Sequence, residues 1–177
     1  MITVRTAILL RVPEAEPLVH EWREQGDPSA AQGVPAHVTL LFPFLPAEAV
    51  DDGVVAELEW FFRGVDAFPF EFTSVGRFEH VGVVFLQPSS DELTQLTRAL
   101  ARRWPECPPY SGEIAVDEVV PHLTIVQTDD RALRQSAANA VSPGLPLRVV
   151  AASAALWVEQ DDATWSEHST FHFGPPE

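Results

Sequence analysis

Two copies of the pattern His-x-Thr lie on apolar segments in the two halves of the chain. The first copy consists of His37 and Thr39, and the second, 85 positions further on, of His122 and Thr124. Histidine can accept or donate a proton near neutral pH, and a threonine hydroxyl can donate a hydrogen bond to an anionic oxygen. Together, two such units hold the groups that acid/base chemistry on a phosphoryl group requires.

The spacing of each copy suits a β-strand. Alternate side chains of a strand share a face, so His37 and Thr39 would lie about 7 Å apart on one face while Val38 and Leu40 point the other way. If both strands border one cleft, one imidazole can take a proton from the attacking water while the other protonates the leaving oxygen. The hydroxyls would stabilise charge on the non-bridging oxygens.

A buried core histidine with a hydrogen-bond partner is the alternative for either copy taken alone. The chain has six histidines, so a single His-x-Thr arises readily by chance. A third copy, His168 and Thr170, lies where Trp165 and Phe171 alternate with polar residues. We interpret that stretch as a half-buried strand whose polar face points to solvent. The first two copies differ because each lies on a mainly apolar strand, where an ionisable group needs a reason.

The residues around these two copies resemble the signature motifs of the two-histidine phosphoesterase superfamily, in its 2′-5′ RNA ligase-like and cyclic phosphodiesterase branch. AHVTLLFPF at 36–44 is similar to the first motif, and PYSG at 109–112 followed by VPHLT at 120–124 is similar to the second. The resemblance spans nearly the whole chain, so we expect residues 1–177 to form a single two-lobed phosphoesterase domain. It implies a pseudo-symmetric α+β fold in which antiparallel sheets face a central cleft and helices pack on the outside.

The resemblance also implies an activity. The implied enzyme is a phosphodiesterase that needs neither a metal nor a cofactor. It would act on 2′,3′-cyclic phosphates or 2′-5′ linkages of nucleotides or RNA ends. His37, Thr39, His122 and Thr124 would be the catalytic residues, and the same histidines would also run the reverse, ATP-independent 2′-5′ ligation. Some RNA-directed members carry an arginine shortly after the second motif; this chain has Gln127 there.

Three aromatic or sulfur-containing residues near the motifs need separate interpretation. Tyr110 is the only tyrosine and is a candidate substrate-binding residue, by stacking on a base or by hydrogen bonding a phosphate oxygen; a tyrosine at the edge of the core is the alternative. Phe42 has the parity of Val38 and is expected in the core. Cys107 is the only cysteine, which excludes an internal disulfide and a cysteine-rich zinc site.

The charge balance restricts the partner. Eleven basic residues, all arginine, stand against 26 acidic ones, for a net charge of -15. Proteins that bind long nucleic acids use clustered Lys and Arg, so we expect a small nucleotide or a terminal cyclic phosphate, not long nucleic acid. The cluster Arg98, Arg102 and Arg103 has helical spacing and is expected to be a solvated helix face.

Missing residues and segments exclude other classes. Without lysine, the chain is neither a ligase with a covalent lysyl-adenylate nor a P-loop enzyme. There is no G-x-S-x-G motif, no secretory apolar segment after Met1 and no apolar run long enough for a bilayer. We therefore expect a soluble, cytoplasmic monomer that does not bind membranes.

Two further functions stay open. One is a binding module that holds a nucleotide or RNA end in the same cleft without turnover, although such a module would not need both histidines. The other is a metalloprotein with His37 and His122 as ligands, which would lack the usual ligand set because no carboxylate is well placed beside either motif. Activity that survives a chelator would separate the enzyme from the metalloprotein.

Apolar periodicity predicts the elements that must position the two motifs. The predicted helices are 13–25, 47–65, 89–104 and 129–141. Strands are predicted at 3–12, 68–72, 81–86, 147–159 and 164–173, and at both motifs.

Overall fold

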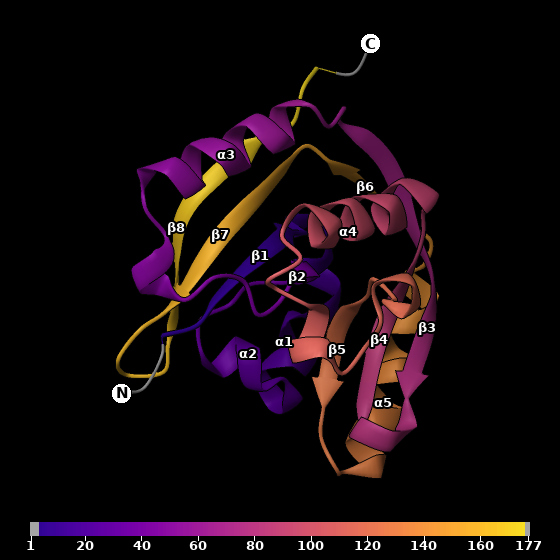
Figure 1. Ribbon diagram of the computed structural model, residues 1–177. Helices are drawn as coiled ribbons and strands as arrows, with labels where there is room; N and C mark the ends of the chain where they lie inside the picture. The colour runs from indigo at the N-terminus through magenta and orange to yellow at the C-terminus, as the bar shows by residue number, and fades with distance from the viewer. Residues whose placement is uncertain (1–3, 176–177) are drawn as a thin grey trace.

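Two four-stranded antiparallel sheets form the framework of the protein (Figure 1). The computed structural model describes residues 4–175. The first sheet has the strand order β2 (His37–Leu41), β1 (Thr6–Arg11), β7 (Ser153–Glu159) and β8 (Trp165–His172). The second has the order β5 (Leu123–Gln127), β4 (Val83–Ser89), β3 (Phe68–Phe78) and β6 (Leu147–Ala151). The predicted α+β fold with two antiparallel sheets is confirmed.

Both motif strands occupy the edge of a sheet. Among the strands of residues 4–175, β2 pairs only with β1 and β5 pairs only with β4, and these two edge strands contact each other. The two sheets thus meet along the strands that carry the His-x-Thr motifs. This arrangement is the pseudo-symmetric, two-lobed architecture that the resemblance implied.

The helices lie outside the sheets and tie the two lobes together (Figure 1). They are α1 (Glu16–Gly26), α2 (Pro28–Ala31), α3 (Asp52–Arg63), α4 (Asp91–Arg103) and α5 (Arg131–Val141). α1 follows a strand of the first sheet yet packs against β5 of the second, while α4 follows the second sheet and packs against β2 of the first. Each motif strand is therefore supported by a helix from the other half of the chain.

One hydrophobic core spans both sheets and fixes which face of each motif strand is buried. Val38 and Leu40 of β2 belong to this core, as do Leu123 and Ile125 of β5. Burial alternates along each strand, and the histidine and threonine of each motif are only half-buried. Since a strand cannot turn one side chain without turning its neighbours, the buried apolar face holds the polar groups at the cleft.

The predicted strand 147–159 is in fact two strands in different sheets. β6 ends at Ala151 in the second sheet, and β7 begins at Ser153 in the first. The chain changes sheets at Ala152, which apolar periodicity does not reveal because the sequence stays mainly apolar from Val149 to Val158 across the break.

The expectation that Phe42 points into a core holds only in part: it does not join the main core of Val38, but it is partly buried against a second, smaller hydrophobic cluster. β2 ends at Leu41, so the alternation of the strand does not extend to Phe42. The Phe42 ring is half-buried and packs edge to face on Trp165, with 6.1 Å between ring centroids.

None of the helices within residues 4–175 is both long and apolar enough to cross a bilayer.

Gly76 of β3 provides a test of how the second sheet packs behind the second motif. It lies opposite Phe85 of β4, and a Cβ atom at Gly76 would overlap the Phe85 ring. We predict that Gly76→Ala lowers the free energy of unfolding by about 1–3 kcal/mol, because the ring must shift. Urea denaturation measures this loss.

Gly64→Ala is the control for this substitution. Gly64 is exposed at the end of α3, and its Cβ would meet the Phe61 carbonyl oxygen at an ordinary contact distance of 3.4 Å. Equal stability of the two variants would contradict the packing described for Phe85.

Candidate active site

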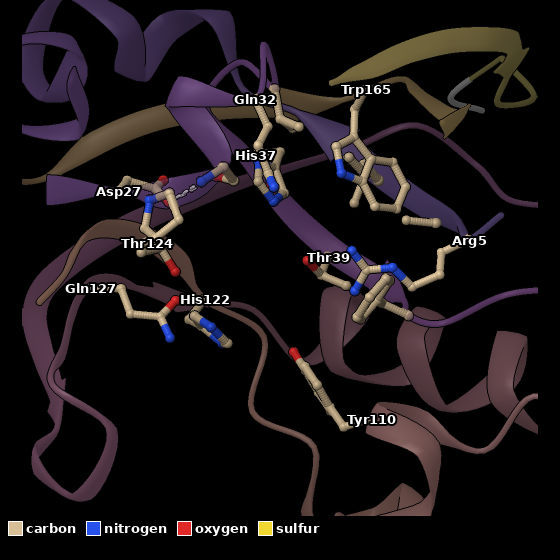
Figure 2. A pocket seen from close by; sticks show the side chains of 16 residues that line it. Arg5, Asp27, Gln32, His37, Thr39, Tyr110, His122, Thr124, Gln127 and Trp165 are labelled. Carbon is tan, nitrogen blue, oxygen red and sulfur yellow. Dashed lines mark hydrogen bonds between the residues drawn. The ribbon is translucent and has the colours of Figure 1, made fainter. Parts of the chain in front are cut away.

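A pocket of about 290 Å³ opens between the two motif strands (Figure 2). His37, Thr39, His122 and Thr124 all line it, and so does Tyr110. Strands 85 positions apart in the sequence thus bring two imidazoles and two threonine hydroxyls to one volume. The third His-x-Thr copy is not brought there, because His168 and the rest of its polar face on β8 are exposed as predicted.

A backbone carbonyl fixes the tautomer of His37. Nδ1 of His37 lies 2.8 Å from the carbonyl oxygen of Pro35, two residues upstream. A carbonyl can only accept, so Nδ1 carries the proton and donates it. In the neutral ring Nε2 is therefore the basic nitrogen, free to accept a proton or, once protonated, to donate one.

The same bond recurs at the second motif. Nδ1 of His122, the residue just before β5, lies 2.8 Å from the carbonyl oxygen of Val120. Two aromatic rings fix the plane of this imidazole: Phe78 packs edge-on at 5.0 Å between centroids, and Phe85 lies at 5.2 Å. In both neutral rings, Nε2 is thus the nitrogen without the proton.

Burial lowers the pKa of both imidazoles and so favours their neutral form. The pKa of His37 is lowered to about 4, chiefly by desolvation. The hydrogen bond to the Pro35 carbonyl partly opposes this shift, and the positive charge of Arg23 contributes to it. Desolvation also lowers the pKa of His122, against the opposing hydrogen bond to Val120. A bound phosphate anion would raise both pKa values, because a nearby negative charge favours the imidazolium. An anion bound between the rings would therefore favour protonation of one of them.

One wall of the pocket carries the residues that can hold the rest of a substrate. Arg5 is the only cationic side chain among the described residues that line the pocket. Its Nε and Nη2 donate to the Glu159 carboxylate at 2.8 and 2.6 Å. The guanidinium lies 5.7 Å from the Phe42 ring centroid and 5.8 Å from that of Trp165. Figure 2 shows Arg5 extending toward Thr39, with Trp165 beside it.

Tyr110 lies where its hydroxyl can act as a neutral donor. Its side chain lines the pocket, and its backbone N–H donates to the Phe42 carbonyl at 2.7 Å. The backbone φ is 50°, a left-handed conformation that is uncommon outside glycine. Burial raises the pKa of the phenol, so the hydroxyl keeps its proton throughout the neutral range.

The sequence did not point to Arg5, Trp165 or Asp27 as pocket residues. Trp165 shares the parity of Phe171, which is in the core, but the pairing of β7 with β8 is irregular between Glu167 and Ser169. Such a bulge changes which face later side chains take, so parity fails across it. For Arg5, the sequence did offer a signal, because a charged residue stands there at the start of a buried strand.

The remaining candidates lie outside the pocket. Arg98 and Arg102 both contact Asp117, and Arg103 pairs with Glu57, so this cluster is partly engaged and not a free basic face. Burial raises the pKa of Cys107 to about 11, which leaves an unreactive thiol. Within residues 4–175, no three His, Cys, Asp or Glu side chains are grouped so that they could hold a metal ion.

Comparison with known proteins identifies the family. The profile of the 2′-5′ RNA ligase superfamily matches residues 11–163, so the chain belongs to this superfamily. Among curated proteins, none matches the chain. Escherichia coli LigT complexed with 3′-AMP has a similar structure, with a TM-score of 0.67 and 18% identity over 97% of this chain and 99% of that one.

Other solved structures share the fold. LigT complexed with NADP+ gives a TM-score of 0.65 at 18% identity, covering 98% of this chain and 99% of the other. The protein TT0787 of Thermus thermophilus gives 0.63 at 17% identity, covering 98% of this chain and all of that one. The resemblance seen in the two motifs is therefore confirmed at the level of family and fold.

The lowered pKa of His37 makes stability depend on pH. In the unfolded chain His37 titrates near 6.5, and in the folded protein near 4. Between these values the unfolded state binds more protons, so the free energy of unfolding rises with pH and is fully recovered above about pH 6.5. We predict that the wild type loses on the order of 2 kcal/mol more than His37→Gln between about pH 7 and pH 4.5. Urea denaturation at both pH values measures it, and identical pH dependence would contradict a neutral, desolvated His37.

Proposed function

We propose that this protein is a metal-independent phosphodiesterase that uses His37 and His122 as an acid/base pair. Its substrates would be 2′,3′-cyclic phosphates or 2′-5′ linkages of nucleotides or RNA ends. The observation that carries the proposal is the pair of imidazoles, each with Nδ1–H held by a carbonyl, on the walls of one pocket. Membership of the 2′-5′ RNA ligase superfamily supports phosphoester chemistry in general.

The reaction needs one imidazole neutral and the other protonated. Nε2 of the neutral ring takes a proton from water as the water oxygen attacks phosphorus. Nε2–H of the other ring gives its proton to the departing 2′ or 3′ oxygen as the P–O bond breaks. The product is a phosphomonoester, and exchange with solvent restores the two protonation states. The hydroxyls of Thr39 and Thr124 would donate to the non-bridging oxygens, where negative charge builds up.

The reverse reaction requires no new residue. If the 5′ hydroxyl of a second nucleotide attacks the cyclic phosphate in place of water, one ring takes its proton, the other protonates the departing 3′ oxygen, and a 2′-5′ bond forms; the reverse of this step cleaves that bond and restores the cyclic phosphate. Without lysine in the chain, such ligation would proceed through the cyclic phosphate and without ATP.

A small nucleotide fits the pocket better than a polymer. Arg5 lines the pocket with its charge paired to Glu159, so it can add only a weak contact to a further anionic group of the substrate, while Trp165, Phe42 and Tyr110 offer rings on which a base can stack. A net charge of -15 opposes a long polyanion. The solved LigT complexes contain 3′-AMP, ATP and NADP+, which supports a preference for small nucleotides here.

Removing either imidazole should abolish most turnover. We predict that His37→Asn and His122→Asn each lower kcat on a nucleoside 2′,3′-cyclic phosphate by about 10²–10⁴-fold. His168→Asn is the matched control, because it removes the histidine of the third His-x-Thr copy, which lies exposed outside the pocket. Steady-state kinetics in the presence of EDTA measures all three variants.

The same assays also test the metalloprotein and the binding module as alternatives. Loss of activity in EDTA, restored by a divalent metal, would favour the metalloprotein over the acid/base pair. Tight nucleotide binding by a folded wild type that turns over no cyclic or 2′-5′ substrate would favour the binding module. Normal turnover by either motif variant would contradict the assignment of that histidine.

The pH dependence of kcat/KM should be bell-shaped and lie on the acid side of neutrality. The free protein is active only when one ring is protonated, and the limbs of the profile report the pKa values of the pair. Because the pKa of His37 is about 4 and that of His122 is also lowered, we predict an optimum below the ordinary histidine value of 6.5. The optimum of kcat should lie at higher pH, since the bound phosphate raises both pKa values. A flat profile from about pH 4 to pH 8 would contradict the mechanism.

A further inference from the structure

A buried ion pair lies beside the first motif. Arg23 and Asp27 are 3% and 6% exposed, and they are the only arginine and the only carboxylate that are buried within residues 4–175. Taking a guanidinium and a carboxylate out of water costs more free energy than a simple pair usually returns. Such a pair therefore calls for a role beyond stability.

The pair is extensively hydrogen bonded. Nε of Arg23 donates to Oδ2 of Asp27 at 2.9 Å, while Oδ1 accepts from both the backbone N–H and the hydroxyl of Ser29, each at 2.9 Å. Nη2 of Arg23 lies 3.1 Å from the Ser29 hydroxyl oxygen and donates to the Val34 carbonyl at 2.9 Å. The forked guanidinium thus connects the end of α1 to the segment that enters β2.

That segment holds the carbonyl on which His37 depends. Arg23 binds the Val34 carbonyl, and a second α1 side chain, Glu16, accepts from the backbone N–H of Ala36 at 2.6 Å. Pro35 lies between these two anchors, and its carbonyl oxygen accepts from Nδ1 of His37. The helix therefore clamps the backbone on both sides of the one group that sets the tautomer of the ring.

The second motif is held differently. The segment before His122 is anchored by Arg98, which donates to the Asp117 carbonyl at 2.7 Å, and by Arg102, which binds the Asp117 carboxylate at 2.9 Å. The Asp117 side chain is 73% exposed, so solvent screens its charge. Packing on Phe78 and Phe85 holds the His122 ring instead. The two motifs match in sequence but differ in how each ring is held.

We propose that Arg23 is a positioning residue which, with Asp27 and Glu16, clamps the Val34–Ala36 segment so that His37 presents Nε2 to the pocket. Arg23 also acts through its charge, since its cation opposes a proton on His37 while Asp27 favours one. The other ionisable groups nearby are His122, whose charge also acts on this ring, Tyr110 and Arg5 in the pocket lining, and Glu16, which binds the backbone of Ala36. The effect of Arg23 on turnover rests on the function proposed above. Its effect on the tautomer and charge of His37 does not.

NMR of ¹⁵N-labelled histidine side chains in the full chain tests the clamp directly, because nitrogen shifts report both tautomer and charge. In the wild type, His37 should be the neutral Nδ1–H tautomer at about pH 5. Arg23→Met should raise the pKa of His37 by about one unit, so that the ring is substantially protonated at that pH, and should mix its tautomers. Asp27→Asn keeps the shape of the carboxylate and should leave the ring neutral. Arg98→Met, the corresponding anchor of the second motif, should not change His37.

A double variant covers the case in which Arg23→Met does not fold. Arg23→Met with Asp27→Asn removes both charges, so no unpaired buried ion remains. It should lose the exclusive Nδ1–H tautomer because the Val34 anchor is gone. If the tautomer and charge of His37 in the double variant equal those of the wild type, the inference is overturned.

Kinetics separates positioning from charge. Arg23→Met should lower kcat by about 10–100-fold with little change in KM, since the guanidinium does not line the pocket. Arg23→Lys keeps the charge but not the fork, so it should leave His37 neutral at about pH 5 without restoring kcat. Wild-type kcat in Arg23→Met would overturn the role in turnover. A wild type without any turnover would overturn the proposed function, and the NMR comparison would still decide this inference.

Discussion

The N–H···O=C bond from each histidine to the carbonyl two residues upstream determines what the pocket can do. Both bonds measure 2.8 Å, and both leave Nε2 as the basic nitrogen. Without them each ring could exchange tautomers or rotate, and two imidazoles in one pocket would not be two oriented groups. The backbone before each motif, at Pro35 and Val120, is therefore as important to the site as the histidines themselves.

The fold meets this requirement by placing both motifs on edge strands. An edge strand has one side free of sheet hydrogen bonds, and here β2 and β5 face each other across those free sides. The apolar face of each strand enters the common core, which prevents a register slip that would turn the histidines away. Since α1 supports β5 and α4 supports β2, each half of the chain stabilises the motif of the other.

Local pattern predicted the motifs well and their surroundings poorly. The alternation around His37 and Thr39 was sufficient to place both side chains on the cleft face, because strand geometry leaves few alternatives. Arg5, Trp165 and the Arg23–Asp27 pair escaped notice because their positions depend on pairings between distant segments. The change of sheet at Ala152 was missed for the same reason, and a bulge in β8 removed the parity on which the interpretation of Trp165 relied.

The central claim is that one phosphoryl group lies between the two imidazoles. A crystal structure with a nucleoside 2′,3′-cyclic vanadate, a mimic of pentacoordinate phosphorus, tests this most directly. We predict that Nε2 of His37 and Nε2 of His122 contact opposite apical oxygens of the vanadate, at about 2.6–3.2 Å. A vanadate that contacts only one of the two rings, or that lies elsewhere in the pocket, would contradict the account.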